Sequence, residues 1–218
     1  YRAFGALVLA YLLGAVPIGF ILVMLRTGQD IRQIQSGRTG GTNAMRAAGF
    51  WTGLATALLD VLKGYFAVET AKVFLPESYL IWALAAVMAI IGHNYSIYMI
   101  NVRDGKLHLG GGAGGAVVLG SALGLWPPSL LILLPVGLFL FYFVGYASVV
   151  TLSFGFMSLA VFAWRAITMG EPGQFALFGL LATLLLVYAL RPNLKALRNG
   201  TERLHGFRAR GVKKVEEK

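Results

Sequence analysis

The sequence predicts an all-α protein, a polytopic bundle of about seven transmembrane helices, and three observations lead to this fold class. Apolar residues make up 57% of the 218 residues and charged residues only 13%. A soluble domain carries about 25% charged residues, so this chain has too few to solvate a globular surface. Its apolar residues also fall into segments that approach the roughly 20 residues needed to cross a bilayer. Positive charge, finally, alternates between successive connecting segments.

Seven apolar segments are the predicted spans, and polar, glycine or proline residues bound each of them. We expect them near residues 3–25, 50–75, 79–101, 111–126, 128–146, 148–169 and 174–191. The first is too long for the apolar core of a signal peptide, and no small-residue cleavage site follows it, so we predict a retained helix. The fourth is short, and Pro127 and Pro128 separate it from the fifth.

Charge predicts the orientation of this bundle, which we assign to residues 1–191. The loops at 26–49 and 102–110 and the tail at 192–218 carry basic residues, whereas the connections at 76–78, 127 and 170–173 hold no Lys or Arg. By the positive-inside rule, the basic loops and the C-terminus lie in the cytoplasm and the N-terminus lies outside. Nine of the nineteen basic residues lie from Arg191 onward, directly after an apolar segment. Such a tail favours contact with anionic phospholipid over nucleic acid.

The loop after the first span has the composition of an anion site. Between Ser36 and Arg46 it combines glycines, hydroxyl and amide donors and two arginines. Glycines let backbone N–H groups point at an anion, and the arginine fork matches phosphate. The expected binding residues are Gly37, Arg38, Gly40, Thr42 and Asn43, with Thr42 or Asn43 capping the helix that follows. The alternative is a solvated loop whose arginines only anchor the topology.

Three ionisable residues lie within or at the end of predicted spans. Asp60 and Lys63 share one helix face at i, i+3 spacing. Because charge inside a membrane is costly, we predict that both face the bundle interior, either as a structural ion pair or as part of a site. Gly64 beside them lets another helix approach closely. His93 ends the third span, where a general base, a substrate hydrogen-bond donor and a packed interfacial residue all remain open.

A glycine-rich run covers residues 110–115. It matches a dinucleotide fingerprint only by letter, because no βαβ unit is possible here. Two alternatives remain. Gly110 and Gly114 could mediate close helix packing, or Gly111, Gly112 and Gly114 could belong to a backbone loop that admits a substrate. No cofactor or metal is expected, since the chain has no cysteine and its three histidines lack metal-binding spacing.

Taken together, these motifs resemble the bacterial acyl-phosphate:glycerol-3-phosphate acyltransferases of the PlsY type. The family pattern Ser-Gly-x-x-Gly-x-Thr-Asn-x-x-Arg is met at residues 36–46, Asp-x-x-Lys-Gly at 60–64 and Gly-His-x-Tyr at 92–95. The closing motif is met by Asn193, Leu197, Gly200 and Glu202. The resemblance extends from the first span to about residue 202.

The chain is a divergent member by this comparison. The family's Phe-Lys-Gly-Gly-Lys-Gly stretch is matched by residues 109–114, where both lysines are lost, and roughly eight additional residues separate it from His93. Leu190 and Ala196 stand where the tail usually has histidine and arginine. Arg38 stands where the family usually has asparagine. We therefore predict that Arg38 supplies the phosphate-binding cation missing at Ala113, with Lys106 in the inserted segment as the rival and Arg103 as a weaker one.

The resemblance implies a multi-pass acyltransferase of the bacterial inner membrane whose active site faces the cytoplasm. It would move a fatty acyl group from acyl phosphate to the 1-hydroxyl of glycerol 3-phosphate, giving lysophosphatidic acid for phospholipid synthesis, and a substrate phosphate would accept the hydroxyl proton. The implied catalytic set is Ser36, Arg46, Asp60, Lys63, His93 and Asn193. The alternatives are a catalytically impaired relative that binds glycerol phosphate or anionic lipid without acyl transfer, and a solute transporter, which the missing internal repeat disfavours.

Overall fold

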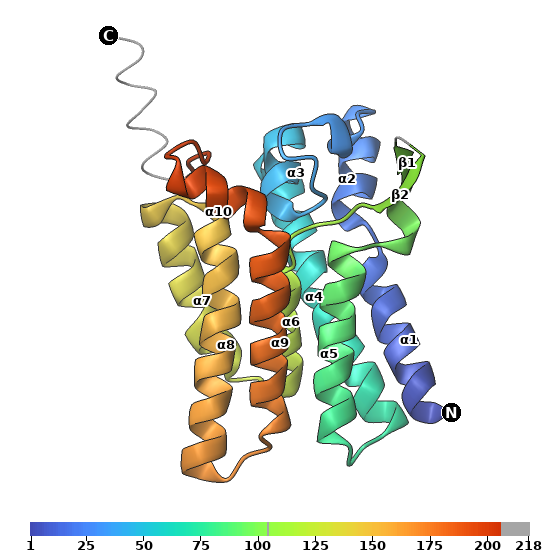
Figure 1. Ribbon diagram of the computed structural model, residues 1–218, viewed down its shortest axis with the longest axis vertical. Coiled ribbons are helices and arrows are strands. Elements are labelled where there is room, and N and C mark those ends of the chain that lie inside the picture. The colour runs from blue at the N-terminus through green and yellow to red at the C-terminus, as the bar shows by residue number, and fades with distance from the viewer. Residues whose placement is uncertain (104, 206–218) are drawn as a thin grey trace.

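The computed structural model describes residues 1–103 and 105–205, without the side chains of Arg103 and Lys106. Its long helices run roughly along one axis, and the short α10 lies across one end of the bundle (Figure 1). They are α1 (Arg2–Ala15), α2 (Ile18–Thr27), α3 (Gly41–Ala48), α4 (Phe50–Phe74), α5 (Tyr79–Asn94), α6 (Gly115–Leu125), α7 (Ser129–Phe139), α8 (Ala147–Met169), α9 (Gln174–Ala189) and α10 (Arg191–Arg198). A π-helical turn at Leu140–Val144 continues α7.

Several of these helices have the length and composition of membrane spans. In the described chain, residues 2–27, 79–99 and 147–169 are long and apolar enough to cross a bilayer, and α9 with α10 would add a fourth span if the bent pair counts as one. The apolar helices α6 and α7 are shorter. The 25-residue α4 carries ionisable residues at Asp60, Lys63, Glu69 and Lys72. The helical bundle is therefore confirmed, whereas seven spans and the orientation of the termini stay predictions.

The first predicted span is broken rather than continuous, because Pro17 interrupts it. Proline lacks an N–H and disfavours the helical conformation in the preceding residue, and Val16 has φ −55° and ψ 118°. The freed carbonyls find partners elsewhere: that of Ala15 accepts from Ser96 Oγ at 2.5 Å, and that of Val16 from Lys63 Nζ at 2.9 Å. Unpaired carbonyls are costly in hydrocarbon, so these two side chains stabilise the break, together with the N–H of Ile18, which donates to the carbonyl of Val16 at 3.0 Å.

A β-hairpin replaces the predicted loop at 102–110 and shortens the spans on either side. α5 ends at Asn94 instead of continuing to 101, and α6 begins at Gly115 instead of 111. Between them β1 (Ile100–Arg103) pairs antiparallel with β2 (Lys106–Leu109). Apolar and polar residues alternate along both strands, which is the period of a strand. A search for long apolar runs does not detect it, so the all-α prediction is correct for the bundle and wrong for this segment.

Small residues let the helices of the core approach closely. α4 packs on α6, α1 on α5 and α8 on α9. A Cβ added at Gly64 would meet the carbonyl of Val117, and one added at Gly120 would meet the carbonyl of Val61. The close helix approach predicted at Gly64 is therefore confirmed. Gly120 on the facing helix α6 likewise lets the two backbones come close together.

We expect Gly120→Ala to destabilise the protein by about 1–3 kcal/mol, because the added methyl has to displace the backbone of α4. Gly5→Ala in α1 is the matched control, since its methyl would meet nothing within 4 Å. Thermal unfolding of the detergent-solubilised variants measures both effects. Equal unfolding midpoints would contradict the tight packing of α4 on α6.

Candidate active site

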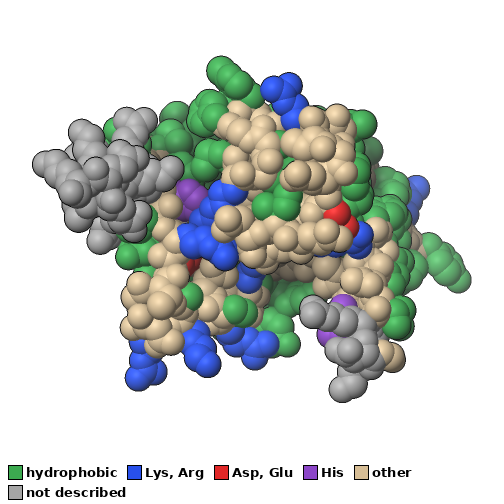
Figure 2. Space-filling model, turned by 90° about the horizontal axis from the view of Figure 1, so that it is seen from above, with side chains coloured by type: hydrophobic (Ala, Val, Ile, Leu, Met, Phe, Trp, Pro, Cys, Tyr) green, Lys and Arg blue, Asp and Glu red, His purple; other side chains and the backbone are tan. Residues whose placement is uncertain are grey.

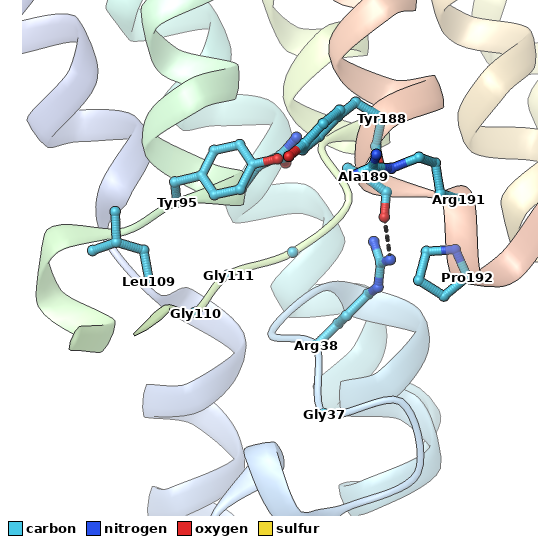
Figure 3. A pocket seen from close by; sticks show the side chains of 12 residues that line it. Gly37, Arg38, Tyr95, Leu109, Gly110, Gly111, Tyr188, Ala189, Arg191 and Pro192 are labelled. Atoms are coloured by element: carbon cyan, nitrogen blue, oxygen red, sulfur yellow. Dashed lines mark hydrogen bonds between the residues drawn. The ribbon is translucent and has the colours of Figure 1, made fainter. Parts of the chain in front are cut away.

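A cavity of about 580 Å³ opens at the end of the bundle that carries α3 and α10. Figure 2 views this end, where several Lys and Arg side chains gather and few acidic ones are visible. Three stretches of chain line the cavity: residues 37–38, the end of α5 with the glycine-rich segment (94–95 and 109–112), and the α9–α10 junction at 188–189 and 191–192 (Figure 3).

Asn43 determines the shape of the first lining loop. Its Nδ2 donates to the carbonyls of Ile34 at 3.0 Å, Arg38 at 2.9 Å and Ile31 at 3.3 Å. α3 begins at Gly41, after Gly40 as N-cap and without a side-chain cap. The prediction that Thr42 or Asn43 caps this helix is therefore wrong. Asn43 lies in the first helical turn and reaches back to hold the loop instead.

Arg38 is a half-buried cation in the cavity wall. Its Nη2 donates to the carbonyl of Ala189 at 2.5 Å (Figure 3). Burial lowers the pKa of its guanidinium, which still stays charged at neutral pH. Among the described residues it forms no salt bridge, and one hydrogen bond uses only one of its five N–H donors. The remaining donors and the charge suit an anion.

The glycine-rich segment forms a second wall and is bonded to both neighbouring segments. Gly112 N donates to the carbonyl of His93 at 2.9 Å, and Thr39 N donates to the carbonyl of Gly111 at 3.2 Å. A Cβ on Gly112 would overlap His93 Nε2, so only glycine allows this approach. The segment passes close to α5 and borders the cavity, as the substrate-loop alternative requires.

The helix-packing alternative for this segment is wrong. Gly110 lies outside any helix, and Gly114 is the N-cap of α6 with φ +94°. Gly114 itself is not among the residues that line the cavity. Of the three glycines predicted to face a substrate, Gly111 and Gly112 line it.

Behind Gly112 lies a buried cluster of Asp60, Lys63 and His93. Lys63 Nζ is 2.9 Å from Asp60 Oδ1 and 2.8 Å from His93 Nδ1. The three residues are 1%, 7% and 5% exposed, which confirms that Asp60 and Lys63 face the interior. A protonated Lys63 can only donate, so His93 Nδ1 accepts and the ring proton lies on Nε2, beside Gly112.

The third wall consists mainly of residues that sequence reasoning had not assigned to the site. α9 and α10 meet at an angle of 65°. At this corner the Arg191 guanidinium lies 3.7 Å from the centre of the Tyr188 ring, and the side chains of Tyr188 and Tyr95 point toward each other (Figure 3). The sequence signal that could have identified this wall was Arg191 followed by Pro192, a cation next to a proline that marks a helix end.

Asn94 is another cavity-lining residue that the sequence motifs did not assign to the site. It lines the cavity and is 5% exposed, yet neither its amide oxygen nor its amide nitrogen has a hydrogen-bond partner among the described residues. Leaving a buried polar group unpaired costs about 1–3 kcal/mol. Both amide atoms are shielded from solvent, so this amide is a buried polar group beside the cavity whose hydrogen-bonding capacity the described residues leave unused.

Ser36 and Asn193, both predicted catalytic residues, lie near the cavity but not in its lining. Ser36 is exposed, and its Oγ accepts from Arg38 N at 3.4 Å. Asn193 on α10 donates to Glu202 at 3.3 Å, and Glu202 in turn accepts from Ser148 Oγ at 2.7 Å. The side chain of Lys106 lies outside the described part of the chain, so its role stays a prediction.

Arg46, a third predicted catalytic residue, contacts the tail. Its guanidinium hydrogen-bonds His205 Nε2, and the His205 ring stacks on Phe141 with 5.4 Å between centroids. The backbone of His205 donates to the carbonyl of Gly145 at 2.8 Å. Burial and the charge of Arg46 lower the pKa of His205 to about 4. A neutral His205 thus holds the tail against α3.

These features define a class: a helical membrane protein with an arginine-lined cavity at one end of its bundle. The profile of the family described as glycerol-3-phosphate acyltransferase matches residues 4–200. Glycerol-3-phosphate acyltransferases from Thermus thermophilus and Rhodopseudomonas palustris are 36% and 38% identical to this chain, over 93% and 90% of it and over 95% and 93% of their own lengths. The chain belongs to this acyltransferase family.

The fold agrees with this assignment. The structure of PlsY (YgiH), an integral membrane glycerol 3-phosphate acyltransferase, in its glycerol 3-phosphate form superimposes with a TM-score of 0.79 at 26% identity, covering 94% of this chain and 96% of that one. Its lysophosphatidic acid form gives a TM-score of 0.77 at 25% identity. The resemblance inferred from the motifs is confirmed, and so is the multi-pass membrane architecture.

We expect acid to weaken the contact between the tail and the bundle. The pKa of His205, about 4, is below its ordinary 6.5, so the unfolded chain binds the proton more readily. The stabilisation from neutral His205 is complete above pH 6.5 and is lost as the pH falls toward 4. Thermal unfolding midpoints between pH 4 and 7.5 should therefore fall less steeply for His205→Gln, which keeps an acceptor for Arg46 but does not titrate. Identical slopes for the two proteins would refute this origin of the pH dependence.

Proposed function

We propose that this protein is a membrane glycerol-3-phosphate acyltransferase that uses acyl phosphate as donor. The observation that carries the proposal is the cavity, whose described lining includes Arg38 and Arg191 and no carboxylate. Donor and acceptor each carry a phosphate, and the planar guanidinium matches phosphate with two parallel hydrogen bonds. Membership of the acyltransferase family supports the reaction class, and the solved relative in its glycerol 3-phosphate form supports the acceptor.

The cavity lining also includes apolar groups that suit the acyl chain. Leu109 and Pro192 line the cavity together with the rings of Tyr95 and Tyr188. The cavity lies where apolar helices end, so a donor with its chain among the lipids can bring its polar end to the arginines. A site that binds both substrates at once supplies proximity, which is a large part of catalysis when no covalent intermediate forms.

The proposed reaction needs only the two substrates. The 1-hydroxyl oxygen of glycerol 3-phosphate attacks the acyl carbonyl carbon, and the bond from that carbon to the phosphate oxygen breaks. A substrate phosphate accepts the hydroxyl proton, so the products are lysophosphatidic acid and inorganic phosphate. Arg38 and Arg191 hold phosphate and offset the charge that develops on the leaving group.

The remaining residues orient these groups. Asn94 is proposed to turn its unpaired amide toward the glycerol hydroxyls or the acyl carbonyl when substrate binds. Asp60 and Lys63 hold His93 in the tautomer that carries its proton on Nε2, beside the Gly112 wall. Ser36, Arg46 and Asn193, which lie outside the cavity lining, are proposed to complete the site around bound substrate.

We also propose that the cavity faces the cytoplasm from the bacterial inner membrane. The basic residues of loop 26–49, of the inserted segment and of the tail support this orientation through the positive-inside rule. In that orientation the water-soluble acceptor reaches the arginines from the cytoplasm, and the apolar donor and product stay in the adjoining leaflet.

A second candidate function is binding of glycerol phosphate or anionic lipid without acyl transfer. It is favoured by the residues at two positions, Ala113 and Leu190, where the family pattern has lysine and histidine. Leu190 is 3% exposed and packs as an apolar residue, so no titratable group occupies that position. Loss of two such groups is what a catalytically impaired relative would show.

A transfer assay distinguishes these functions. Purified protein in nanodiscs is expected to convert radiolabelled glycerol 3-phosphate to lysophosphatidic acid with palmitoyl phosphate, and not with palmitoyl-CoA. Binding of glycerol 3-phosphate is measured in parallel by calorimetry. Binding without product from either donor would establish the non-catalytic alternative. Product from palmitoyl-CoA alone would overturn the donor assignment, and absence of both binding and turnover would overturn the whole proposal.

Arg38→Ala is expected to weaken the apparent affinity for glycerol 3-phosphate at least about tenfold, because a charge-assisted hydrogen bond typically contributes about 1.5–3 kcal/mol. Lys195→Ala is the matched control, since Lys195 is an exposed cation on α10 outside the cavity lining. Arg46→Ala and Lys106→Ala are measured beside them.

The same series tests whether Arg38 replaces the cation missing at Ala113. If the two positions contact one anion, Ala113→Lys should restore binding in the Arg38→Ala background. If Arg38→Ala binds normally while Lys106→Ala does not, the inserted segment supplies the cation and the Arg38 prediction is wrong.

A further inference from the structure

The β-hairpin between α5 and α6 has an uncovered aliphatic face. The register pairs Ile100 with Leu109 and Val102 with Leu107. Because side chains alternate between the two faces of a strand, these four residues share one face. They are 48%, 46%, 65% and 75% exposed, respectively. The described chain does not cover these four large aliphatic side chains. Together they form an exposed apolar patch of the kind that binds a protein or a membrane.

The other face of the hairpin is polar. The register pairs Asn101 with His108, and both residues are exposed. The hairpin is therefore amphipathic, with an aliphatic face and, opposite it, a face that carries the amide of Asn101 and the imidazole of His108.

The position of the hairpin identifies the partner. It projects at the outer edge of the bundle beside α2, at the end that carries the cavity (Figure 1). It directly follows the apolar stretch 79–99, which is long enough to span a bilayer. Near the end of that stretch, Ile97 and Tyr98 are 46% and 55% exposed. Along the chain, the aliphatic face of the hairpin thus follows directly on the exposed apolar residues at the end of this candidate span. Leu25 at the end of α2 is 79% exposed as well.

We propose that this hairpin is an anchor in the phospholipid leaflet at the cavity end of the protein. The aliphatic face formed by Ile100, Val102, Leu107 and Leu109 lies against the upper acyl chains, and the polar face lies among the headgroups. The hairpin stays at interfacial depth, because a two-stranded ribbon has unpaired backbone groups at both edges that hydrocarbon cannot satisfy and headgroups and water can.

The anchor bears on the cavity through chain continuity. Leu109 belongs both to the aliphatic face and to the cavity lining, and Gly110 and Gly111 follow it along the wall. Fixing the hairpin at the interface therefore fixes the cavity mouth at headgroup depth. This role is independent of the proposed acyl transfer, since it would hold equally for a protein that only binds its ligand.

Spin labelling tests the proposal directly, because the chain contains no cysteine and single cysteines can be introduced without removing others. Leu107→Cys and Val102→Cys report on the aliphatic face, and their neighbours His108→Cys and Asn101→Cys are matched controls on the polar face. Each variant is labelled and placed in nanodiscs of phosphatidylcholine and phosphatidylglycerol. Power saturation then compares access of oxygen, which concentrates in lipid, with access of a water-soluble nickel chelate.

Oxygen is expected to be the more effective relaxant at 102 and 107, and the nickel chelate at 101 and 108. Greater nickel access at all four positions would place the hairpin in water and overturn the proposal. Exclusion of both reagents from 102 and 107 would show a protein partner instead, and dipolar coupling between labels would identify it as a second copy. The adjacent pair Leu107→Cys and His108→Cys is sufficient if another variant misfolds, as judged by gel filtration.

Discussion

The ammonium group of Lys63 joins the segments on which the cavity depends. It lies between Asp60 on its own helix, His93 on α5 and the carbonyl of Val16 in the break of the first span. An unpaired buried ammonium costs several kcal/mol, and here two hydrogen-bond acceptors and the carboxylate of Asp60 surround it. Because the His93 ring is held from this side, its other nitrogen defines the surface on which Gly112 lies. The glycine wall of the cavity is therefore positioned by an ion cluster that the cavity itself does not contain.

Much of the architecture was predictable because its signals are local. Hydropathy alone predicts the helical membrane bundle, and i, i+3 spacing predicts that Asp60 and Lys63 face inward together. The anion-binding composition of the loop at 36–46 correctly directs attention to Arg38, which lines the cavity. In each case, the property depends on residues within one or two helical turns, so the interactions that decide it are visible in the sequence.

The remainder depends on contacts between distant segments. Tyr188 and Arg191 join the cavity only because α9 and α10 meet at 65°, and nothing in their neighbourhood shows which loop they face. Arg46 contacts His205, 159 residues further along the chain. The break at Pro17 and the β-hairpin did have local sequence signals: a proline, and a two-residue alternation of apolar and polar residues. Both signals lie within or beside apolar segments, where hydropathy averaged over a long window does not detect them.

The interrupted first span has a consequence for biogenesis. Ribosomes deliver α1 and α2 to the membrane before Lys63 and Ser96 exist, yet these residues, 47 and 81 positions downstream of their acceptors, satisfy the carbonyls of Val16 and Ala15. Until then the carbonyl of Ala15 lacks its Ser96 donor, and that of Val16 has only the N–H of Ile18, at 3.0 Å, in a hydrocarbon core that offers no water. The nascent first segment therefore has to remain beside the hydrated insertion channel until α4 and the residues after α5 arrive, and it enters lipid as part of an assembled group of helices rather than alone.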